Sequence, residues 1–492
     1  MHKLPKSDKF KYHKSGIYIT DAMAITREAT RRSGAGEEGR AFEHTEKGLA
    51  HVIDVHDVIS DNFYVSMKSG LGEVEGVNPT VLLSILTQLV DGKALTFGNW
   101  GLGKTTLAEA SIALTYGVPT TVTISSEAKG DSEVTKEEFI AMPNLSNMNE
   151  IIWRRFAQLP PKVIDEFNRL PHLKQAMFLD AIDRSNFEYM NQTLRASPGP
   201  IYATANWPDR GNVELLPAMR DRFDIATVAG SMNPLLEFTL EQRQFKNGEL
   251  DNEEIAYRML GVLDDHTKGY AAKIDELESL SEQFKADLSK RLGIVTLTAS
   301  ERKALNRHIR GIGLSTDAIW FKAFIRSESS CPDCGERMPD AKSAHKEGCH
   351  YEGSEVEYAF NTMTNHLSER FTKSLELYAK ALSWFTTGPS GAPVVEPWHM
   401  KQVLPYVMWH RVGFSASFQS SQRNIAGMKV SDLDLAKEVG NGMFLRYEEQ
   451  RRQISELNSA MVSEDEQALS ALASASDHPL FKHAVKLLRS EE

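Results

Sequence analysis

Residues 98–105 have the spacing of a phosphate-binding loop, since they match the pattern G-x-x-x-x-G-K-[ST] at every fixed position. Glycines in such a loop let backbone N–H groups turn toward phosphate oxygens, at a helix N-terminus whose dipole favours anions. Lys104 is expected to reach the β and γ phosphates of a nucleotide, and the Thr105 hydroxyl to bind Mg²⁺. The residues expected to hold the nucleotide and its Mg²⁺ are Gly98, Asn99, Trp100, Gly101, Leu102, Gly103, Lys104, Thr105, Thr106 and Asp165.

Acidic and amide side chains that can complete this site follow two apolar runs farther along the chain. Asp165 and Glu166 follow the apolar pair at 163–164, and Asn206 ends the run at 201–205. We expect Asp165 to hold Mg²⁺, usually through water, and Glu166 to orient and deprotonate the attacking water. The amide of Asn206 is expected to hydrogen-bond the γ-phosphate or that water.

A second group of chemically active side chains lies between residues 331 and 349, which contain all three cysteines of the chain. Cys331, Cys334, His345 and Cys349 form a Cys-x₂-Cys…His-x₃-Cys arrangement, which can surround one ion tetrahedrally, and thiolates with imidazole favour Zn²⁺. Four protein ligands leave no open position, so we expect a structural zinc that pins a polar loop. Two alternatives stay open: His350 replaces Cys349 or supports it, or the thiols are free in an exposed loop.

The hydrophobic pattern supplies a scaffold for these groups. Asn78 and Pro79 begin a predicted helix that ends near Gly92, because an N-cap and a first-turn proline precede apolar residues at helical spacing. Strands are predicted at 94–97, 120–125, 163–164, 201–205 and 225–228, and a further helix at 104–116. Strands that alternate with helices indicate an α/β fold with a parallel sheet whose faces are covered.

Beyond Asp224 the sequence is mostly helical and charged. Apolar residues recur at spacings of three and four over 274–292, and a second helical block covers 357–409 with a turn at 388–391. The predicted organisation is an N-terminal extension that is partly ordered (1–60), an α/β nucleotide-binding domain (61–235), a helical insertion or part of a lid (236–325), a zinc-binding loop (326–355), a helical lid (356–412) and a helical C-terminal extension and tail (413–492).

Composition excludes some classes of protein. The 492 residues are 41% apolar and 25% charged, which is typical of a globular chain with about three structural units. The formal charge of −11 argues against a protein that coats nucleic acid non-specifically, although it leaves room for a local basic pore. No run approaches 18 apolar residues, so we expect no membrane span, and three clustered cysteines without a secretory signal indicate a cytoplasmic protein.

Taken together, these motifs resemble those of AAA+ ATPases, and specifically the MoxR family of the helix-2-insert clade. Residues 165–169 match the family's acidic motif, and 176–182 its following helix. Residues 186–195 match the presensor hairpin, 203–206 the sensor 1 strand, and 216–223 the segment with the arginine finger. Segments 368–370, 378–382 and 395–411 resemble the family's helical lid, and the resemblance covers about half of the chain.

The resemblance implies roles for three arginines. Arg222 corresponds to the arginine finger that reaches a neighbouring subunit's site, with Arg220 as the alternative, and Arg370 to a sensor 2 that contacts the γ-phosphate of its own subunit. The sequence departs from the family at Trp207, which separates Asn206 from the usual proline, at 365–370, and in the longer region 236–356.

The resemblance also implies a function. The main hypothesis is an ATP-hydrolysing ring, most often a hexamer, that remodels or activates a partner protein. That partner would be a separate von Willebrand A-domain protein, because this chain has no Asp-x-Ser-x-Ser motif. The alternative is a nucleic-acid translocase of the same clade that uses ATP or GTP, although the hairpin at 187–195 offers one acid and one base for gripping phosphates. A ring that does not hydrolyse nucleotide is a third, weaker hypothesis.

Overall fold

The computed structural model describes most of the chain from residue 38 onward. The described ranges are 38–64, 69–72, 74–145, 150–207, 213–230, 235, 238, 247–335, 345, 348–351, 358–388, 391–426, 430–463 and 465–489, with the backbone alone described for 38–44 and 487–489. The first 37 residues of the expected N-terminal extension, and much of the expected zinc-binding loop, therefore lie outside the described residues.

A five-stranded parallel sheet forms the centre of the molecule. Its strands are β1 (Lys93–Phe97), β2 (Ala128–Lys129), β5 (Lys162–Asp165), β8 (Ile201–Ala205) and β9 (Ile225–Val228), in the spatial order β2-β5-β8-β1-β9. Every neighbouring pair is parallel. All five residues of β8 are buried, as expected where helices cover both faces of a parallel sheet. The α/β prediction is confirmed.

The register of the sheet separates two edges that matter for the site. Phe97 pairs with both Ala205 and Val228, and Ile164 pairs with Ala203. Strands β1, β5 and β8 therefore end together, and we call this side the carboxyl edge. At the opposite side, the amino edge, the backbone N–H of Asp224 donates to the Lys93 carbonyl at 2.8 Å. Roughly 13 Å separate the two edges along β1, at about 3.3 Å per residue.

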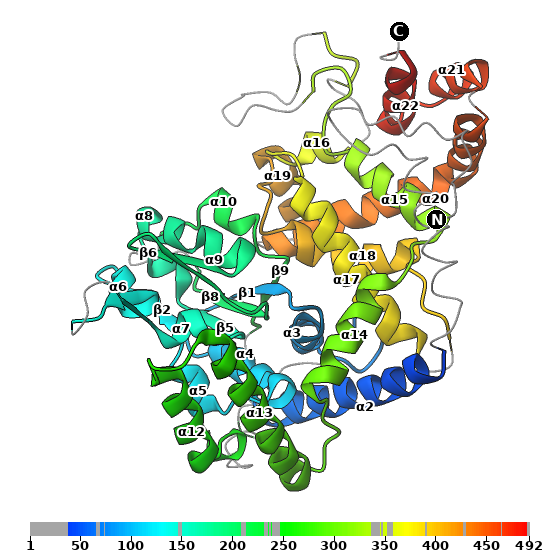
Figure 1. The fold of residues 1–492 in the computed structure, drawn as a ribbon. Helices are drawn as coiled ribbons and strands as arrows, with labels where there is room; N and C mark the ends of the chain where they lie inside the picture. Colours follow the sequence, from blue (N-terminus) through cyan, green and yellow to red (C-terminus); the bar gives the residue numbers. More distant parts are fainter. Residues whose placement is uncertain are drawn as a thin grey trace, which may run out of the picture.

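Helices cover the sheet on both faces (Figure 1). On one side lie α3 (Pro79–Val90) and α4 (Lys104–Ser111), and on the other α8 (His172–Gln175), α9 (Leu179–Arg184) and α10 (Pro217–Arg220). Helix α3 is buried along its whole length, and Asn78 caps it by accepting a hydrogen bond from the Thr80 N–H at 3.0 Å. Helix α4 continues into a π-helical segment, Ile112–Tyr116, so the predicted helix at 104–116 is confirmed.

The predicted strand at 120–125 is wrong. Residues Thr120–Ile124 form a short helix, α5, and β2 begins three residues after the predicted segment ends. The alternation of threonine with Val122 and Ile124 resembles a strand, but Pro119 precedes it with a φ of −52°, and its carbonyl accepts from the Val122 N–H. The proline therefore starts a helical turn in place of an extended run.

A β-hairpin made of β6 (Asn186–Tyr189) and β7 (Gln192–Arg195) confirms the predicted hairpin at 186–195. Its two turn residues, Met190 and Asn191, have φ values of 45° and 62°, as a two-residue hairpin turn requires. The remaining small elements of this half are β3 (Ala141–Pro143), β4 (Ile151–Trp153), α6 (Lys136–Phe139), α7 (Arg155–Gln158) and the 3₁₀ turns Phe167–Arg169 and Ala176–Phe178.

Helix α2 (Glu38–Asn62) begins within the predicted N-terminal extension, 1–60, and ends two residues beyond it. Leu49, Val52, Val55 and Ile59 are buried and belong to the main hydrophobic core. The helix packs against α3 and against α14 (Ala299–Gly311), so the sequence-based boundary at residue 60 falls inside the core (Figure 1). Its apolar residues recur at helical spacing, but charged residues between them obscure the pattern.

The C-terminal half is helical, as predicted. Its other elements are the 3₁₀ turn Asn247–Leu250, α12 (Glu253–Asp264), α13 (Tyr270–Leu292), α15 (Thr316–Ser327), α16 (Ala359–Thr362), α17 (Glu369–Thr387), α18 (Pro397–Met408), α19 (Ala416–Ala426), α20 (Asp432–Val462), α21 (Glu466–Ala475) and α22 (Pro479–Arg489). Helix α18 packs on β9, and Trp409 donates from Nε1 to the Ala226 carbonyl at 2.8 Å. The helical half is thereby joined to the sheet. In the described part of the chain, no helix combines the length and the apolar character needed to cross a membrane.

Candidate nucleotide and metal sites

The phosphate-binding loop lies between β1 and α4, at the carboxyl edge of the sheet. Gly101 and Gly103 have φ values of 76° and 70°, a left-handed conformation that side chains with a Cβ rarely adopt. The Lys104 ammonium donates to the Gly98 carbonyl at 3.1 Å, to the Asn99 carbonyl at 2.7 Å, and to Oδ1 of Asn206 at 2.9 Å. Burial lowers the pKa of Lys104, while the charges of Asp165 and Glu166 oppose that shift.

Other residues of the loop differ in exposure. The Trp100 side chain is 81% exposed, Thr106 is exposed in the first turn of α4, and Leu102 packs against the core. Tyr64, just after α2, packs against the loop: a Cβ placed on Gly103 would lie 3.6 Å from Cδ2 of Tyr64. The sequence pattern does not identify this tyrosine, because no helix or strand is predicted before residue 78.

Thr105, Asp165 and Thr204 form a hydrogen-bonded group beside the loop. Oδ1 of Asp165 accepts from Thr105 Oγ1 at 2.7 Å and from Thr204 Oγ1 at 2.6 Å. The hydroxyl of Thr204 in turn accepts from the Glu166 N–H at 2.9 Å. A hydroxyl and a carboxylate that offer oxygen atoms to one point are the donors that Mg²⁺ prefers, so this group fits the predicted metal ligands.

Glu166 is held in a left-handed backbone conformation, with a φ of 50°. Such a conformation costs on the order of 1–3 kcal/mol and occurs often where a side chain must be aimed for function. Its Oε1 accepts from Asn206 Nδ2 at 3.3 Å and forms an ion pair with Arg169 at 3.1 Å. The backbone carbonyl of Glu166 packs on Gly130, where an added Cβ would lie only 2.0 Å from it, so this position requires glycine.

Asn206 is buried between three partners. Besides contacting Lys104 and Glu166 with its side chain, it exchanges two hydrogen bonds with Asn168: its N–H donates to Asn168 Oδ1 at 3.1 Å, and its carbonyl accepts from Asn168 Nδ2 at 2.8 Å. Asn168 and Thr204 are further site residues. They lie within the motifs at 165–169 and 203–206, but the sequence alone predicts no role for them. The structure therefore brings Lys104, Thr105, Asp165, Glu166 and Asn206 together at one edge.

Arg222 and Arg370 lie elsewhere, toward the amino edge. Nε of Arg222 and Nη2 of Arg370 are each 3.0 Å from Oδ2 of Asp183, and Arg370 also pairs with Asp221 at 3.3 Å. Asp221 lies three residues before Asp224, whose backbone N–H is hydrogen-bonded to the carbonyl of Lys93, the first residue of β1. Arg370 therefore lies beside Arg222, and its expected contact with the γ-phosphate of its own subunit stays a prediction.

Arg220, the alternative to Arg222, has a different environment. It pairs with Glu214 at 3.2 Å, and Glu214 is largely exposed. Arg222 also donates from Nη1 to the Ala218 carbonyl at 2.7 Å and is 16% exposed. Arg222 is thus the more firmly held of the two arginines.

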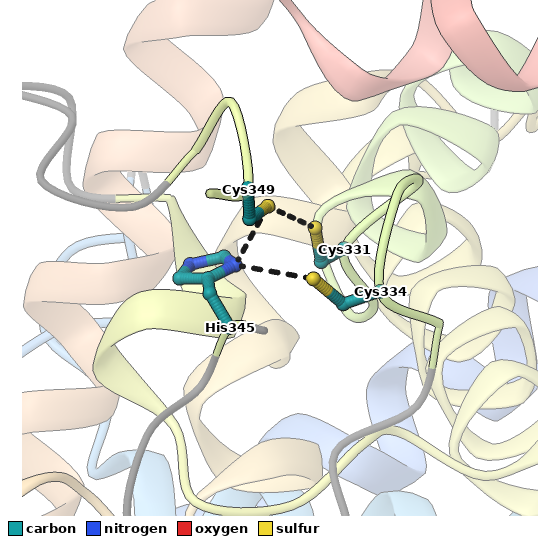
Figure 2. A group of neighbouring side chains, drawn as sticks. All are labelled: Cys331, Cys334, His345 and Cys349. Atoms are coloured by element: carbon teal, nitrogen blue, oxygen red, sulfur yellow. Dashed lines mark hydrogen bonds between the residues drawn. The ribbon is translucent and has the colours of Figure 1, made fainter. Parts of the chain in front are cut away.

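The predicted metal ligands converge in Figure 2, where three sulfur atoms and one ring nitrogen point toward a common centre. The ligand atoms of Cys331, Cys334, His345 and Cys349 all lie within 4.8 Å of one another. The Sγ atoms of Cys331 and Cys349 are 3.6 Å apart, and Nδ1 of His345 lies 3.4 Å from Cys349 Sγ and 3.9 Å from Cys334 Sγ. A tetrahedral site with Zn–S bonds of about 2.3 Å has edges of roughly 3.8 Å, so the four residues fit a zinc ion.

The surroundings of this cluster orient its histidine. Nε2 of His345 lies 2.5 Å from Oδ1 of Asn361, which fixes the ring and leaves Nδ1 for the metal. Nε2 of His350, the alternative ligand, lies 3.5 Å from Oδ1 of Asp477, and His350 is not part of the cluster of four ligand atoms. Tyr351, Tyr358 and Phe360 pack around the cysteines as a small separate core.

Comparisons with known proteins add little to this geometry. No protein-family model matches the chain, and no curated protein matches its sequence. The chain is similar to the crystal structure of a protein from Cytophaga hutchinsonii described as a presumed ATPase, with 16% identity and a TM-score of 0.48 over 80% of this chain and 99% of the other. A TM-score below 0.5 at this identity supports no conclusion, so function has to be argued from the side chains of this chain.

Proposed function

We propose that the protein is an ATPase that binds Mg²⁺-ATP at the carboxyl edge of its sheet and hydrolyses it. The observation that carries this proposal is the convergence of Lys104, Thr105, Asp165, Glu166 and Asn206 in one set of hydrogen bonds, which Thr204 connects by donating to Asp165 and accepting from the Glu166 N–H. A phosphate loop alone would support binding only. A carboxylate and an amide held beside it supply what is needed to activate water.

In this proposal each side chain has one task. Lys104 exchanges its contacts with the Gly98 and Asn99 carbonyls for phosphate oxygens, and Thr105 with Asp165 holds the metal. Mg²⁺, when bound, neutralises charge on the phosphates. Glu166 accepts the proton of the attacking water. Asn206 hydrogen-bonds both Glu166 and Lys104 and so fixes their positions relative to each other.

We further infer that the active form is a ring in which Arg222 and Arg370 act on the nucleotide of a neighbouring subunit. The support is their distance from their own phosphate loop: they lie toward the amino edge, and the loop lies at the carboxyl edge. The resemblance to MoxR-type AAA+ proteins suggests a hexamer that remodels a separate partner, of the von Willebrand A-domain class.

The cluster of Cys331, Cys334, His345 and Cys349 is proposed as a structural Zn²⁺ site. Its support is the ligand geometry and the orienting contact from Asn361. Four protein ligands leave no position for a substrate, so the ion is assigned no role in hydrolysis.

The proposed function is tested by comparing the wild-type protein with Glu166→Gln. The amide of glutamine can orient water but cannot accept its proton, so turnover should fall about 10²–10⁴-fold while the affinity for a fluorescent ATP analogue stays the same. Glu253→Gln, an exposed carboxylate of α12, is the matched control and should match wild type. Unchanged turnover in Glu166→Gln would refute the proposed base.

Parallel assays should contain GTP, and ATP with single-stranded DNA. Hydrolysis that rises only with DNA would favour the translocase hypothesis over protein remodelling.

A further inference from the structure

Asp183 connects two arginines that come from distant parts of the chain. Its Oδ2 lies 3.0 Å from Nε of Arg222 and 3.0 Å from Nη2 of Arg370. Asp183 belongs to α9, Arg222 follows α10, and Arg370 lies in the first turn of α17, 187 residues beyond Asp183. One carboxylate thus joins the sheet-bearing half of the molecule to its C-terminal helices.

The contacts of each arginine show what Asp183 adds. Arg222 is also held by the Ala218 carbonyl, at 2.7 Å, and Arg370 by Oδ2 of Asp221, at 3.3 Å. Asp183 is the contact that they share, and its side chain is only 18% exposed. Arg370 is 46% exposed, so its guanidinium is anchored on one side and open to solvent on the other.

Charge explains why a shared acid is useful here. Two guanidinium groups held side by side repel each other unless an anion lies between them. Asp221 already accepts from Ser368 and lies 3.6 Å from Nε of Arg411, so Asp183 is left as the anion common to Arg222 and Arg370. The charge of Asp224 also acts on Arg411, so three aspartates face these three arginines, and Asp183 is the one placed between Arg222 and Arg370.

We propose that Asp183 is a positioning residue that holds Arg222 and Arg370 in a single geometry, so that both meet the phosphates of a neighbouring subunit's nucleotide together. The inference rests on the proposed function, because it needs a nucleotide bound across a subunit interface. Asp183 repels phosphate itself and acts only through the two arginines. Arg370 lies in the first turn of α17. A shift of the C-terminal helices would therefore move Arg370 and change hydrolysis in the neighbouring subunit.

Asp183→Asn tests this role, because it keeps the shape of the side chain and removes its charge. Turnover should fall about 10²-fold, as expected when catalytic groups are displaced by about 1 Å, while binding of a fluorescent ATP analogue stays at wild-type affinity. Hydrogen exchange of residues 366–372 should become faster, since α17 loses a contact with α9. Asp183→Glu should recover part of the turnover.

Two controls separate this role from a general loss of structure. Glu214→Gln removes the ion pair of the neighbouring Arg220 and should leave turnover unchanged. Mixing Asp183→Asn subunits with Glu166→Gln subunits should restore partial activity, because one supplies an intact base and the other an intact pair of arginines.

The outcomes distinguish the inference from the function on which it rests. If Arg222→Ala is inactive but Asp183→Asn has wild-type turnover, the positioning role is refuted and the ATPase proposal survives. If Asp183→Asn loses ATP affinity, or is not rescued by mixing, Asp183 acts within its own subunit and the inference is wrong. If Arg222→Ala itself keeps wild-type turnover, the trans arrangement fails, and the inference with it.

Discussion

The positive charge of Lys162 is buried among aromatic rings and backbone carbonyls. It is 3% exposed at the start of β5, and its ammonium lies over the rings of Phe156 and Phe187, 5.8 Å and 5.2 Å from their centroids. Nζ donates to the Leu159 carbonyl at 2.5 Å, and burial lowers the pKa of Lys162 to about 7 from its usual 10.5. The folded protein therefore binds this proton more weakly than the unfolded chain does.

This difference makes stability depend on pH in a definite direction. Between pH 7 and 10.5 the unfolded chain holds more protons at this residue, so the contribution of Lys162 to stability improves as pH rises. Lys162→Met removes the titration, and its stability relative to wild type should be greatest at pH 7 or below and decline toward pH 10, by on the order of a few kcal/mol. Urea unfolding at pH 6.5, 8 and 9.5 measures this, with exposed Lys136→Met as the control. If the free energy of unfolding differs between the variant and wild type by the same amount at all three pH values, folding does not lower the pKa of Lys162.

At the residue scale, the sequence predicts the position of a side chain where residues close to it in the chain determine that position. Lys104, Thr105, Asp165 and Glu166 could be predicted because the spacing of the loop and the end of a strand determine where they lie. Asp183 could not, because its two partners come from other segments and only the packing of α17 on the core brings Arg370 to it. The position of Arg370 beside Arg222 could not be predicted for the same reason.

Among the structural elements, the predicted zinc-binding loop (326–355) is joined to the C-terminal helices. Tyr351 donates from its hydroxyl to the Asp477 carbonyl at 3.0 Å, and Lys486 of α22 donates to the Pro332 carbonyl. Buried Glu328, just after α15, accepts from Arg446 of α20 and lies 3.1 Å from His478 Nε2. Zinc binding should therefore stabilise the docking of α22 as well as the loop itself.

The zinc site can be tested through this connection. The wild-type protein should contain about one zinc per chain, and Cys331→Ser combined with Cys334→Ser should contain none and be cleaved faster by trypsin within residues 477–489. Asn361→Ala should weaken zinc binding about 10–100-fold, because His345 loses the group that orients its ring. His350→Ala, next to the cluster but outside it, is the control and should keep its zinc. Normal metal content in the double variant would contradict the assignment.

Elements with strong periodicity could be predicted from the sequence, and elements with mixed signals could not. The buried strands β8 and β9, and helix α3 with its N-cap, first-turn proline and apolar residues at helical spacing, have patterns that favour one structure. Residues 120–124 alternate like a strand but are too few to outweigh Pro119, and α2 carries its apolar residues among many charges. Pro119 thus decides the first case locally, whereas for α2 packing against α3 and α14 decides what the local pattern leaves open.

For the whole molecule, the separation of the two sheet edges favours the proposed arrangement of more than one subunit. The groups proposed to bind phosphate and activate water lie where the strands end, whereas Arg222 and Arg370 lie toward the edge where the strands begin. Strand β1 spans roughly 13 Å between these two edges. A fixed guanidinium that meets charge on the γ-phosphate contributes about 10³–10⁵ to turnover in phosphoryl transfer. In the proposed arrangement each Arg222 serves the nucleotide of a neighbour, so we expect full activity to need more than one subunit.

Mixing two inactive variants tests that requirement. Arg222→Ala subunits should bind ATP normally and hydrolyse it about 10³-fold or more slowly, and Glu166→Gln subunits should also be inactive alone. In a mixed ring, an Arg222→Ala subunit keeps its Glu166 and receives an intact Arg222 from a Glu166→Gln neighbour, so that interface is complete. Turnover should therefore rise on mixing and reach its maximum near equal amounts, with mixed assemblies verified by mass. If Arg222 acted within its own subunit, every subunit would retain one defect and no ratio would restore activity.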